Sequence, residues 1–567
     1  MKVKSTFGLA LLAVASGALS SCGGGKGGSA AIEFWSSFGS AYTTVLDGIV
    51  ASTAEKVSNN FGATVDIAHL SQGSYDKVKE RMMSAISDIS YPDLVTGYPD
   101  HFAEYSANKI LHPLDELVKT YDEKHGTNLL SDYFPGYMAE NYAVDCDESG
   151  QPVLSALPFN KSTELMGYNG VFVDYCASLA EYKDYHLDVV PKTWQEWAEK
   201  GPKYRAILDT FVGNVKAGVK GKCLYGIQDY EGTASQFEVA EYQGDTYHDK
   251  NLLLNFTEVD GELSRVIGWD STDNMFITLV RQWGAQYTNL TSSELAKNAY
   301  NRVGDIMFYS NSNKPKVIKC MQFFNDLNKK HIFSTPNEFQ ASYMSDAFKD
   351  NKVMFMLCSS GGLSYNTAKW TNRFRVAPLP YNADLGDAGK YVISQGADIT
   401  LTDNASAHYE EAFEAMVEMT TGDLQAEWCL QTGYYPCSQS ATNSTKYQEF
   451  LKEATDEGIE KYMADYGVSK EEALKHAYSV PTRVAYREGS QVNQEHYMNE
   501  SEHWTKFVDA AFKGSAVIRT LCKAVFEDVF VQTNANITDA ECDAILKNII
   551  KNDKIVRNNN INVVIAD

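Results

Sequence analysis

Positive charge is scarce in this 567-residue sequence: 50 Lys and Arg residues stand against 74 Asp and Glu residues, for a formal net charge of −24 at pH 7. A surface of this charge repels nucleic acid phosphates and anionic lipid headgroups, so neither is an expected partner. Proline is also sparse, with 14 residues, whereas hydrophobic residues make up 44% of the chain. This composition is typical of a packed globular protein, and the length exceeds what one core organises, so we expect two lobes.

Motifs for catalysis and metal binding are missing as well. The sequence has no G-x-S-x-G elbow, H-E-x-x-H pair, P-loop, Rossmann glycine fingerprint or C-x-x-C pair. The acidic stretch at residues 270–274 lacks the glycine and distal glutamate of a calcium loop, so we expect a solvated turn there. We therefore expect no metal and no cofactor. An enzyme (a surface hydrolase) and a structural adhesin remain as minor alternatives.

Ten cysteines are scattered along the chain without the spacing of a zinc site. The nine that follow Cys22 are expected to be small buried side chains, with one or two disulfides possible. Cys429 and Cys437 are the only close pair.

The first 21 residues are typical of a secretory leader. Lys2 and Lys4 precede an uncharged apolar run over residues 7–18, and small residues follow. The sequence "LSSC" then resembles the bacterial lipoprotein signal, which predicts a lipidated Cys22, with ordinary secretion as the alternative. The glycine-rich residues 22–30 predict a flexible tether. No later segment is long and apolar enough to cross a bilayer, so we expect an extracytoplasmic, lipid-anchored protein.

Short apolar runs alternate with helical patterns from residue 30 onward. "AIEFWSSF", "ATVDIAHL" and "PDLVTGY" predict strands, and helices are expected over residues 41–60, 74–87 and 101–110. This order predicts a mainly parallel sheet covered by helices on both faces, with ligands beyond the carboxyl ends of its strands. Further strands are expected in "RVAPLPY" and "GADITL", and one amphipathic helix over residues 413–431. Residues 230–268 and 455–480 are interpreted as insertions, and the last residues have no assignment.

At this point the sequence resembles family 1 of the extracellular solute-binding proteins of bacterial ABC importers. It is most similar to the branch that binds glycerol 3-phosphate and glycerophosphodiesters. The motifs that carry the resemblance are "FWSSF", "GSYDKVKERM", "PDLVTGY", "LHPLDELV", "LPFNKSTELMGYN", "PKTWQEWA", "CSSGG", "QGADITL", "EWCLQTGYYPCS" and "FKGSAVIR". Their common order spans residues 32–529, with the two insertions as the main departures.

The resemblance implies an α/β, two-lobed periplasmic-binding-protein fold of type II, with a hinge between the lobes. The first lobe would take residues 30–155 and a return segment at 375–425. The second lobe would take residues 156–374 and 426–567.

The resemblance also implies a set of ligand-binding residues, carried over one by one from the branch's motifs. These are Tyr75 in "GSYDK", Ser162 in "FNKST", Trp194 in "PKTW", Ser359 in "CSSGG", Gly396 in "QGADITL", Tyr434 in "TGYYP" and Arg519 in the C-terminal helix. Together they offer hydroxyl, backbone and guanidinium donors that suit a phosphate group. For each residue an ordinary structural role is the alternative: turn formation for the serines, core packing for Trp194 and a surface ion pair for Arg519.

Two positions depart from the branch. Lys161 replaces the first serine of its "FNSST" motif. Pro99 stands where the branch has an acidic residue that accepts hydrogen bonds from glycerol hydroxyls, and Asp100 follows it directly. We expect Asp100 to supply that carboxylate.

The function expected from sequence is capture without chemistry. A monomer would bind glycerol 3-phosphate or a glycerophosphodiester between its lobes and deliver it to membrane permease subunits. The alternative is an oligosaccharide-binding lipoprotein of a sugar importer, because sugar binders share this fold and also present aromatic side chains to their ligands.

Overall fold

The computed structural model describes residues 30–216, 239–242, 245–247, 264–290, 304–349, 352–362, 374–470, 473, 476–477, 504–506, 511–532, 536–551 and 563–565. The expected leader, lipidated Cys22 and tether, and parts of both expected insertions, lie outside these residues.

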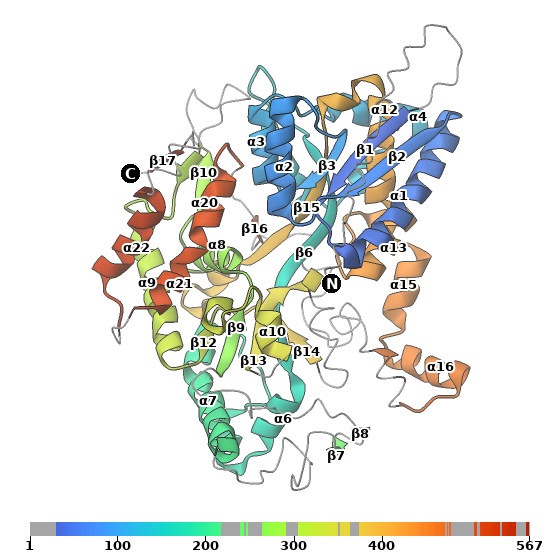
Figure 1. Cartoon of the computed structure of the whole chain (residues 1–567). Coiled ribbons are helices and arrows are strands. Elements are labelled where there is room, and N and C mark those ends of the chain that lie inside the picture. The colour runs from blue at the N-terminus through green and yellow to red at the C-terminus, as the bar shows by residue number, and fades with distance from the viewer. Residues whose placement is uncertain are drawn as a thin grey trace, which may run out of the picture.

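The first lobe begins with the expected β-α-β series (Figure 1). Its elements are β1 (Ala30–Ser36), α1 (Ser40–Phe61), β2 (Val65–Ser71), α2 (Tyr75–Asp88), β3 (Leu94–Gly97) and α3 (Pro99–Ala107), followed by α4 (Asp115–His125) and α5 (Pro135–Asn141). β1 pairs in parallel with both β2 and β3. Helix α2 starts where expected because the Ser74 side chain accepts the Lys77 N–H, which caps the helix.

The second lobe builds its sheet from β9 (Arg265–Trp269), β12 (Phe333–Ser334) and β13 (Val353–Ser359). Its helices are α6 (Gly170–Ser178), α7 (Trp194–Lys216), α8 (Thr272–Gln282), α9 (Lys314–Lys329), α10 (Met344–Lys349), α20 (Ser515–Cys522), α21 (Ala524–Phe530) and α22 (Asp539–Lys551). β9 corrects one expectation, because residues 265–268 are a strand of the central sheet and not part of an insertion.

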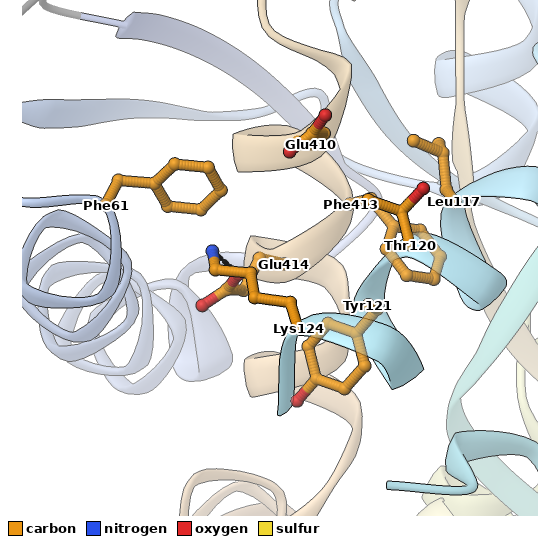
Figure 2. Close-up of a pocket in the computed structure, with 8 residues that line it drawn as sticks. All are labelled: Phe61, Leu117, Thr120, Tyr121, Lys124, Glu410, Phe413 and Glu414. Carbon is orange, nitrogen blue, oxygen red and sulfur yellow. Dashed lines mark hydrogen bonds and ion pairs between the residues drawn. The ribbon is translucent and has the colours of Figure 1, made fainter. Parts of the chain in front are cut away.

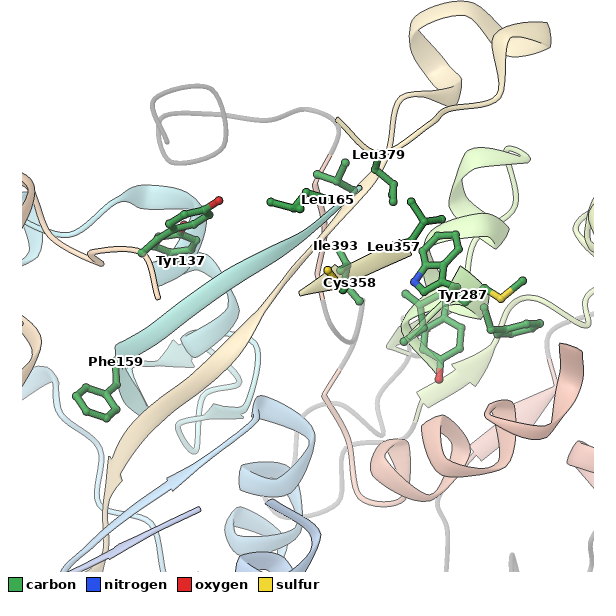
Figure 3. Packing of buried hydrophobic residues seen from close by; sticks show 14 of the residues in the cluster. Tyr137, Phe159, Leu165, Tyr287, Leu357, Cys358, Leu379 and Ile393 are labelled. Carbon is green, nitrogen blue, oxygen red and sulfur yellow. The ribbon is translucent and has the colours of Figure 1, made fainter. Parts of the chain in front are cut away.

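Two long strands connect the lobes. β6 (Ala156–Asn169) pairs antiparallel with β15 (Val392–Leu401) through its first half and with β13 through its second half. β15 in turn pairs with β3, so one sheet runs through the molecule in the order β12-β9-β13-β6-β15-β3-β1-β2. β14 (Phe374–Ala377) and β16 (Trp504–Lys506) flank it on β6 and β15. Every residue of β6 and β15 is buried, and the hydrophobic core continues along them (Figure 3).

The helix expected over residues 413–431 is two helices. α12 (Tyr409–Thr420) and α13 (Gly422–Thr432) are separated by Thr421, whose backbone is extended, and α13 begins with Gly422 at φ 58°. Both helices pack against α1 on the first lobe, which extends the expected return segment past residue 425. The charged segment after residue 455 contains α16 (Asp456–Tyr466), and β17 (Val563–Ile565) in the unassigned tail pairs with β11 (Gly304–Ile306).

The Cys429 and Cys437 side chains are buried free thiols and not a disulfide. The Cys437 thiol donates a hydrogen bond to the Phe159 carbonyl oxygen at 3.2 Å.

Candidate functional site

Alternate residues of β6 carry polar side chains at the junction of the lobes. Asn160 Nδ2 donates to the Tyr75 hydroxyl at 3.0 Å, and the Ser359 hydroxyl donates to the Ser162 hydroxyl at 3.3 Å. Glu164, two residues further, accepts a hydrogen bond from Asn274 Nδ2 at 3.0 Å. Because side chains alternate along a strand, Asn160, Ser162 and Glu164 share one face of β6. Three of the expected ligand-binding residues are thus at this face: Ser162 lies on it, and Tyr75 and Ser359 contact it.

A group of aromatic side chains lies beside the start of this face. The Tyr75 and Tyr98 rings are 4.5 Å apart between centroids, and Tyr434 stacks on Trp428 at 6.3 Å with an interplanar angle of 7°. Burial raises the pKa of Tyr75, Tyr98 and Tyr434 above the usual tyrosine value. Their phenol groups are therefore neutral hydrogen-bond donors throughout the physiological pH range.

Arg519 comes from helix α20 of the second lobe and reaches the first lobe. Its Nε donates to Asp100 Oδ2 at 2.9 Å, its Nη1 donates to Asp273 Oδ2 at 3.1 Å, and its guanidinium carbon lies 5.6 Å from the centre of the Tyr98 ring. Burial opposes the charge of Arg519, but Asp100 and Asp273 outweigh burial and raise its pKa. Burial likewise opposes ionisation of Asp100, and Arg519 outweighs it, so the pKa of Asp100 is lowered. All three groups are charged.

Asp100 lies in the first turn of α3, directly after Pro99 at the first helical position. Its side chain is fully buried, and its Oδ1 atom accepts no hydrogen bond from the described residues. A buried carboxylate oxygen without a donor is costly unless a ligand or water supplies one. Asp100 thus fits the role expected for the acidic residue that is absent at position 99.

Gly396 brings the backbone of β15 against β6. Its φ angle is 118°, and an added Cβ would lie 1.8 Å from the Asn160 carbonyl oxygen. Only glycine fits this conformation and this contact. Gly361 has a related role after Ser359, because an added Cβ would lie 2.7 Å from the Tyr434 ring. The two glycines let strands and ring approach closely at the junction.

Lys161 points to the opposite face of β6 from Ser162. It is fully buried and ion-paired with Glu140 and with Asp398, whose Oδ1 is 2.6 Å away, and it donates to the Gly396 carbonyl at 3.1 Å. Burial raises the pKa of Asp398 against the opposing charge of Lys161. The lysine that departs from the branch's serine therefore ties β6 to β15 and α5.

Trp194 is the expected site residue that the structure places elsewhere. Its side chain has no exposed surface, packs at 6.1 Å from Trp269 and 4.9 Å from Phe324 between ring centroids, and donates to Gln282 Oε1 at 2.6 Å. These contacts put Trp194 in the core of the second lobe, and we assign it a structural role instead of the expected one as a cleft wall.

Several polar residues at the junction were missed from sequence. Asp273 and Asn274 were expected in a solvated turn, but both are buried, because α8 begins there and Arg519 and Glu164 bind their side chains. Asn160 lies inside the quoted motif "LPFNKSTELMGYN", which gave the only available signal for it, whereas Tyr98 was expected at the carboxyl end of the third strand, where ligands of such sheets bind.

A serine-histidine-aspartate relay exists in the first lobe. The Ser36 hydroxyl is 2.7 Å from His69 Nε2, and His69 Nδ1 is 2.6 Å from Asp47 Oδ1. Ser36 has no exposed surface, so no substrate carbonyl reaches its hydroxyl. The relay stabilises the end of β1 and gives no support to a hydrolase.

A surface pocket lies between α1, α4 and α12, away from the junction (Figure 2). Its polar centre is Glu414, which is bound by Lys124 Nζ at 2.8 Å and by Asn60 Nδ2 at 2.6 Å. The Lys124 ammonium also lies 3.4 Å from the centre of the Phe61 ring. Glu414, Lys124 and Asn60 are therefore paired with one another, so we assign these side chains a structural role and no ligand.

Among the described residues, no group of three or more His, Cys, Asp or Glu side chains could hold a metal ion. No helix within the same residues is long and apolar enough to span a membrane.

Comparison with known proteins gives concordant results. The profile of the bacterial extracellular solute-binding protein family matches residues 53–455. The sn-glycerol-3-phosphate-binding periplasmic protein UgpB of Yersinia pseudotuberculosis is 22% identical over 428 residues, which cover 74% of this chain and 77% of that protein.

Solved structures share the fold. UgpB from Mycobacterium tuberculosis in complex with glycerophosphocholine is 17% identical, with a TM-score of 0.57 over 94% of this chain and 100% of that one. The GacH receptor of Streptomyces glaucescens, solved unliganded and with acarbose, is 13% identical, with a TM-score of 0.54 over 92% and 99%. The chain therefore belongs to the bacterial extracellular solute-binding proteins, which bind small molecules for ABC importers and are not enzymes.

Proposed function

We propose that this protein captures glycerol 3-phosphate or a glycerophosphodiester at the junction of its lobes. The observation that carries the proposal is the meeting of Arg519 from the second lobe with Asp100 and Tyr98 from the first, beside the Ser162–Ser359 pair. The relative from Yersinia, whose name states glycerol 3-phosphate binding, adds support from outside the chain.

The proposed phosphate contacts are hydroxyl, amide and guanidinium donors. Ser162, Ser359, Tyr75 and Tyr434 would donate hydroxyl hydrogens, Gly396 would donate its backbone N–H, and Arg519 would supply charge-assisted bonds. Asp100 Oδ1, which is buried without a donor, would accept hydrogen bonds from glycerol hydroxyls. Such bonds to a charged acceptor each contribute about 1.5–3 kcal/mol.

Binding would act by shifting the population of lobe arrangements. The ligand would contact residues of both lobes at once, so its binding energy would favour the form in which the lobes meet, with β6 and β15 acting as the hinge. That form would dock as a monomer on membrane permease subunits. Lipids on Cys22 would hold the protein at the membrane, where two or more acyl chains are needed for stable anchoring.

An oligosaccharide is the second candidate, and one observation favours it. Arg519 is already neutralised by Asp100 and Asp273, the Tyr98 ring lies 5.6 Å from it, and the Tyr75 ring lies 4.5 Å from Tyr98. Carboxylates that accept sugar hydroxyls and rings that stack on sugar faces suit a neutral ligand.

A thermal-shift panel separates the candidates. The purified protein would be measured with glycerol 3-phosphate, glycerophosphocholine and malto-oligosaccharides, together with the variants Arg519→Ala and Arg205→Ala. Arg205 is a matched control, because it is a buried arginine of the second lobe that binds Ser264 and Asp209 instead of the junction.

We expect the phosphate-bearing ligands to raise the Tm of the wild type and of Arg205→Ala, but not of Arg519→Ala. A response to malto-oligosaccharides alone would replace the proposal with the second candidate.

A further inference from the structure

Two residues of α3, one helical turn apart, contact helix α20 across the boundary between the lobes. Asp100 binds the Arg519 side chain, and Glu104 Oε1 accepts the backbone N–H of Gly514 at 2.8 Å. Helices α3 and α20 thus contact each other directly, in addition to the strands β6 and β15 that connect the lobes (Figure 1). Positions four apart on a helix share one face, which explains why Asp100 and Glu104 reach the same partner helix.

Gly514 is the N-cap residue of α20, and its N–H has no partner within that helix. In many helices a Glu at the third helical position reaches back to the N-cap N–H. The residue at that position of α20 is Val517, which has no polar group. Gly514 itself has no side chain that could cap the helix, and its φ angle is 100°. Glu104 from the other lobe therefore satisfies a donor that α20 itself leaves open.

The position also suits a negative charge. The N-terminus of a helix carries a partial positive charge, so a carboxylate there is stabilised. Glu104 is 7% exposed, and burying its carboxylate is costly unless the N–H of α20 stays in place. The contact is thus favourable only while α3 and α20 lie together.

We propose that Glu104 is a positioning residue that fastens α20 to α3, holds the lobes together and thereby sets the affinity of the junction for its ligand. Glu104 does not touch the ligand. It acts through α20, which carries Arg519 five residues after Gly514. The inference about affinity rests on the proposed function, whereas the inference about lobe contact does not.

The test compares wild type, Glu104→Ala, Glu104→Gln, Glu104→Asp and the control Glu116→Ala. Glu116 is an exposed carboxylate of the first lobe that pairs only with Lys119 among the described residues. Small-angle X-ray scattering of each ligand-free protein measures the radius of gyration, and calorimetric titration with glycerophosphocholine measures Kd.

We expect Glu104→Ala and Glu104→Asp to show a larger ligand-free radius of gyration than wild type and a Kd about tenfold higher, since one charge-assisted bond is lost. Glu104→Gln keeps an acceptor oxygen but loses the charge at the N-terminus of α20, so it should lie between wild type and Glu104→Ala, whereas Glu116→Ala should match wild type. A fall in Tm with unchanged radius and Kd would reduce Glu104 to a structural residue and overturn the proposal.

If Glu104→Ala fails to fold, Glu104→Asp decides, because it keeps the charge and shortens the reach. If wild type binds neither glycerophosphocholine nor glycerol 3-phosphate, the proposed function is wrong, and the radii of gyration alone still confirm or overturn the role of Glu104.

Discussion

Arg519 and Asp100 form an ion pair between the lobes, with Arg519 Nε 2.9 Å from Asp100 Oδ2. Asp273 takes a second hydrogen from the same guanidinium group at 3.1 Å. One arginine therefore connects a helix of each lobe, and its charge is balanced before any ligand arrives.

Asp100→Asn removes the proposed acceptor for glycerol hydroxyls and half of this ion pairing. We expect the Kd for glycerophosphocholine, measured by titration calorimetry, to rise about 10- to 100-fold, as for loss of one charge-assisted hydrogen bond. Asp273→Asn is the control, because it also weakens the pairing of Arg519 but leaves Asp100 in place, and its effect should be smaller. Equal Kd values for wild type and Asp100→Asn would show that Asp100 does not bind the ligand.

Lys161→Met should destabilise the fold strongly. It leaves Glu140 and Asp398 buried beside each other without their cation, and breaking a buried pair in this way costs about 3–5 kcal/mol. Urea unfolding would measure the loss. The double variant Lys161→Met with Asp398→Asn should recover part of it, because one uncompensated carboxylate is gone. No recovery would mean that packing, and not charge, explains the loss.

Gly396→Ala should cost about 3–5 kcal/mol and weaken ligand binding, because the new Cβ would meet the Asn160 carbonyl at 1.8 Å. Gly422→Ala is the matched control. Gly422 also has a positive φ, of 58°, but an added Cβ there meets no atom within 4 Å, so its cost should be about 1 kcal/mol. Similar unfolding free energies for the two variants would show that the backbone angle alone, without the close approach, determines the cost.

Glu164→Gln should change the pH dependence of stability. Burial raises the pKa of Glu164 to about 8, against an ordinary value near 4.5. Between these values the folded state binds the proton and the unfolded state does not, so the contribution of Glu164 to stability is present at pH 4.5 and is lost as pH rises through 8. Relative to wild type, Glu164→Gln should therefore gain unfolding free energy from pH 5 to pH 8.5. Parallel plots of Tm against pH for the two proteins over this range would contradict the raised pKa of Glu164.

Trp194→Phe should lower the Tm and leave the Kd for glycerophosphocholine unchanged. The variant loses the hydrogen bond to Gln282 and part of the packing against Trp269 and Phe324, at a cost of about 1–3 kcal/mol. A changed Kd with an unchanged Tm would indicate that Trp194 contacts the ligand and would contradict its structural role.

The fold was predictable where local signals agree with tertiary structure. The first three strands and helices follow the sequence pattern within a few residues, since Ser74 caps α2 and Pro99 opens α3. The break between α12 and α13 was missed, because the apolar spacing continues through Thr421 and Gly422 while their backbone angles do not. Strand β9 was missed because its partners, β12 and β13, come much later in the chain.

The sequence predicted seven of the residues that meet at the junction, but neither their pairing nor the further residues Asn160, Asp273 and Asn274. The structure brings together the expected Tyr75, Asp100, Ser162, Ser359, Gly396, Tyr434 and Arg519 around the junction, whereas Trp194 packs in the core. The partnership of Arg519 with Asp273 depends on α8 and α20, which are some 250 residues apart in sequence, so no local pattern reports it. The burial of Asp273 follows from the same distant contact.

The balanced charge around Arg519 also bears on selectivity against the simplest anions. Inorganic phosphate offers charge and little else, so to engage the guanidinium group it must compete with two carboxylates already in place. A larger guest that supplies hydroxyl hydrogens to Asp100 compensates for that competition. With the proposed ligand, the pairing would act as a filter that excludes abundant small ions from the site.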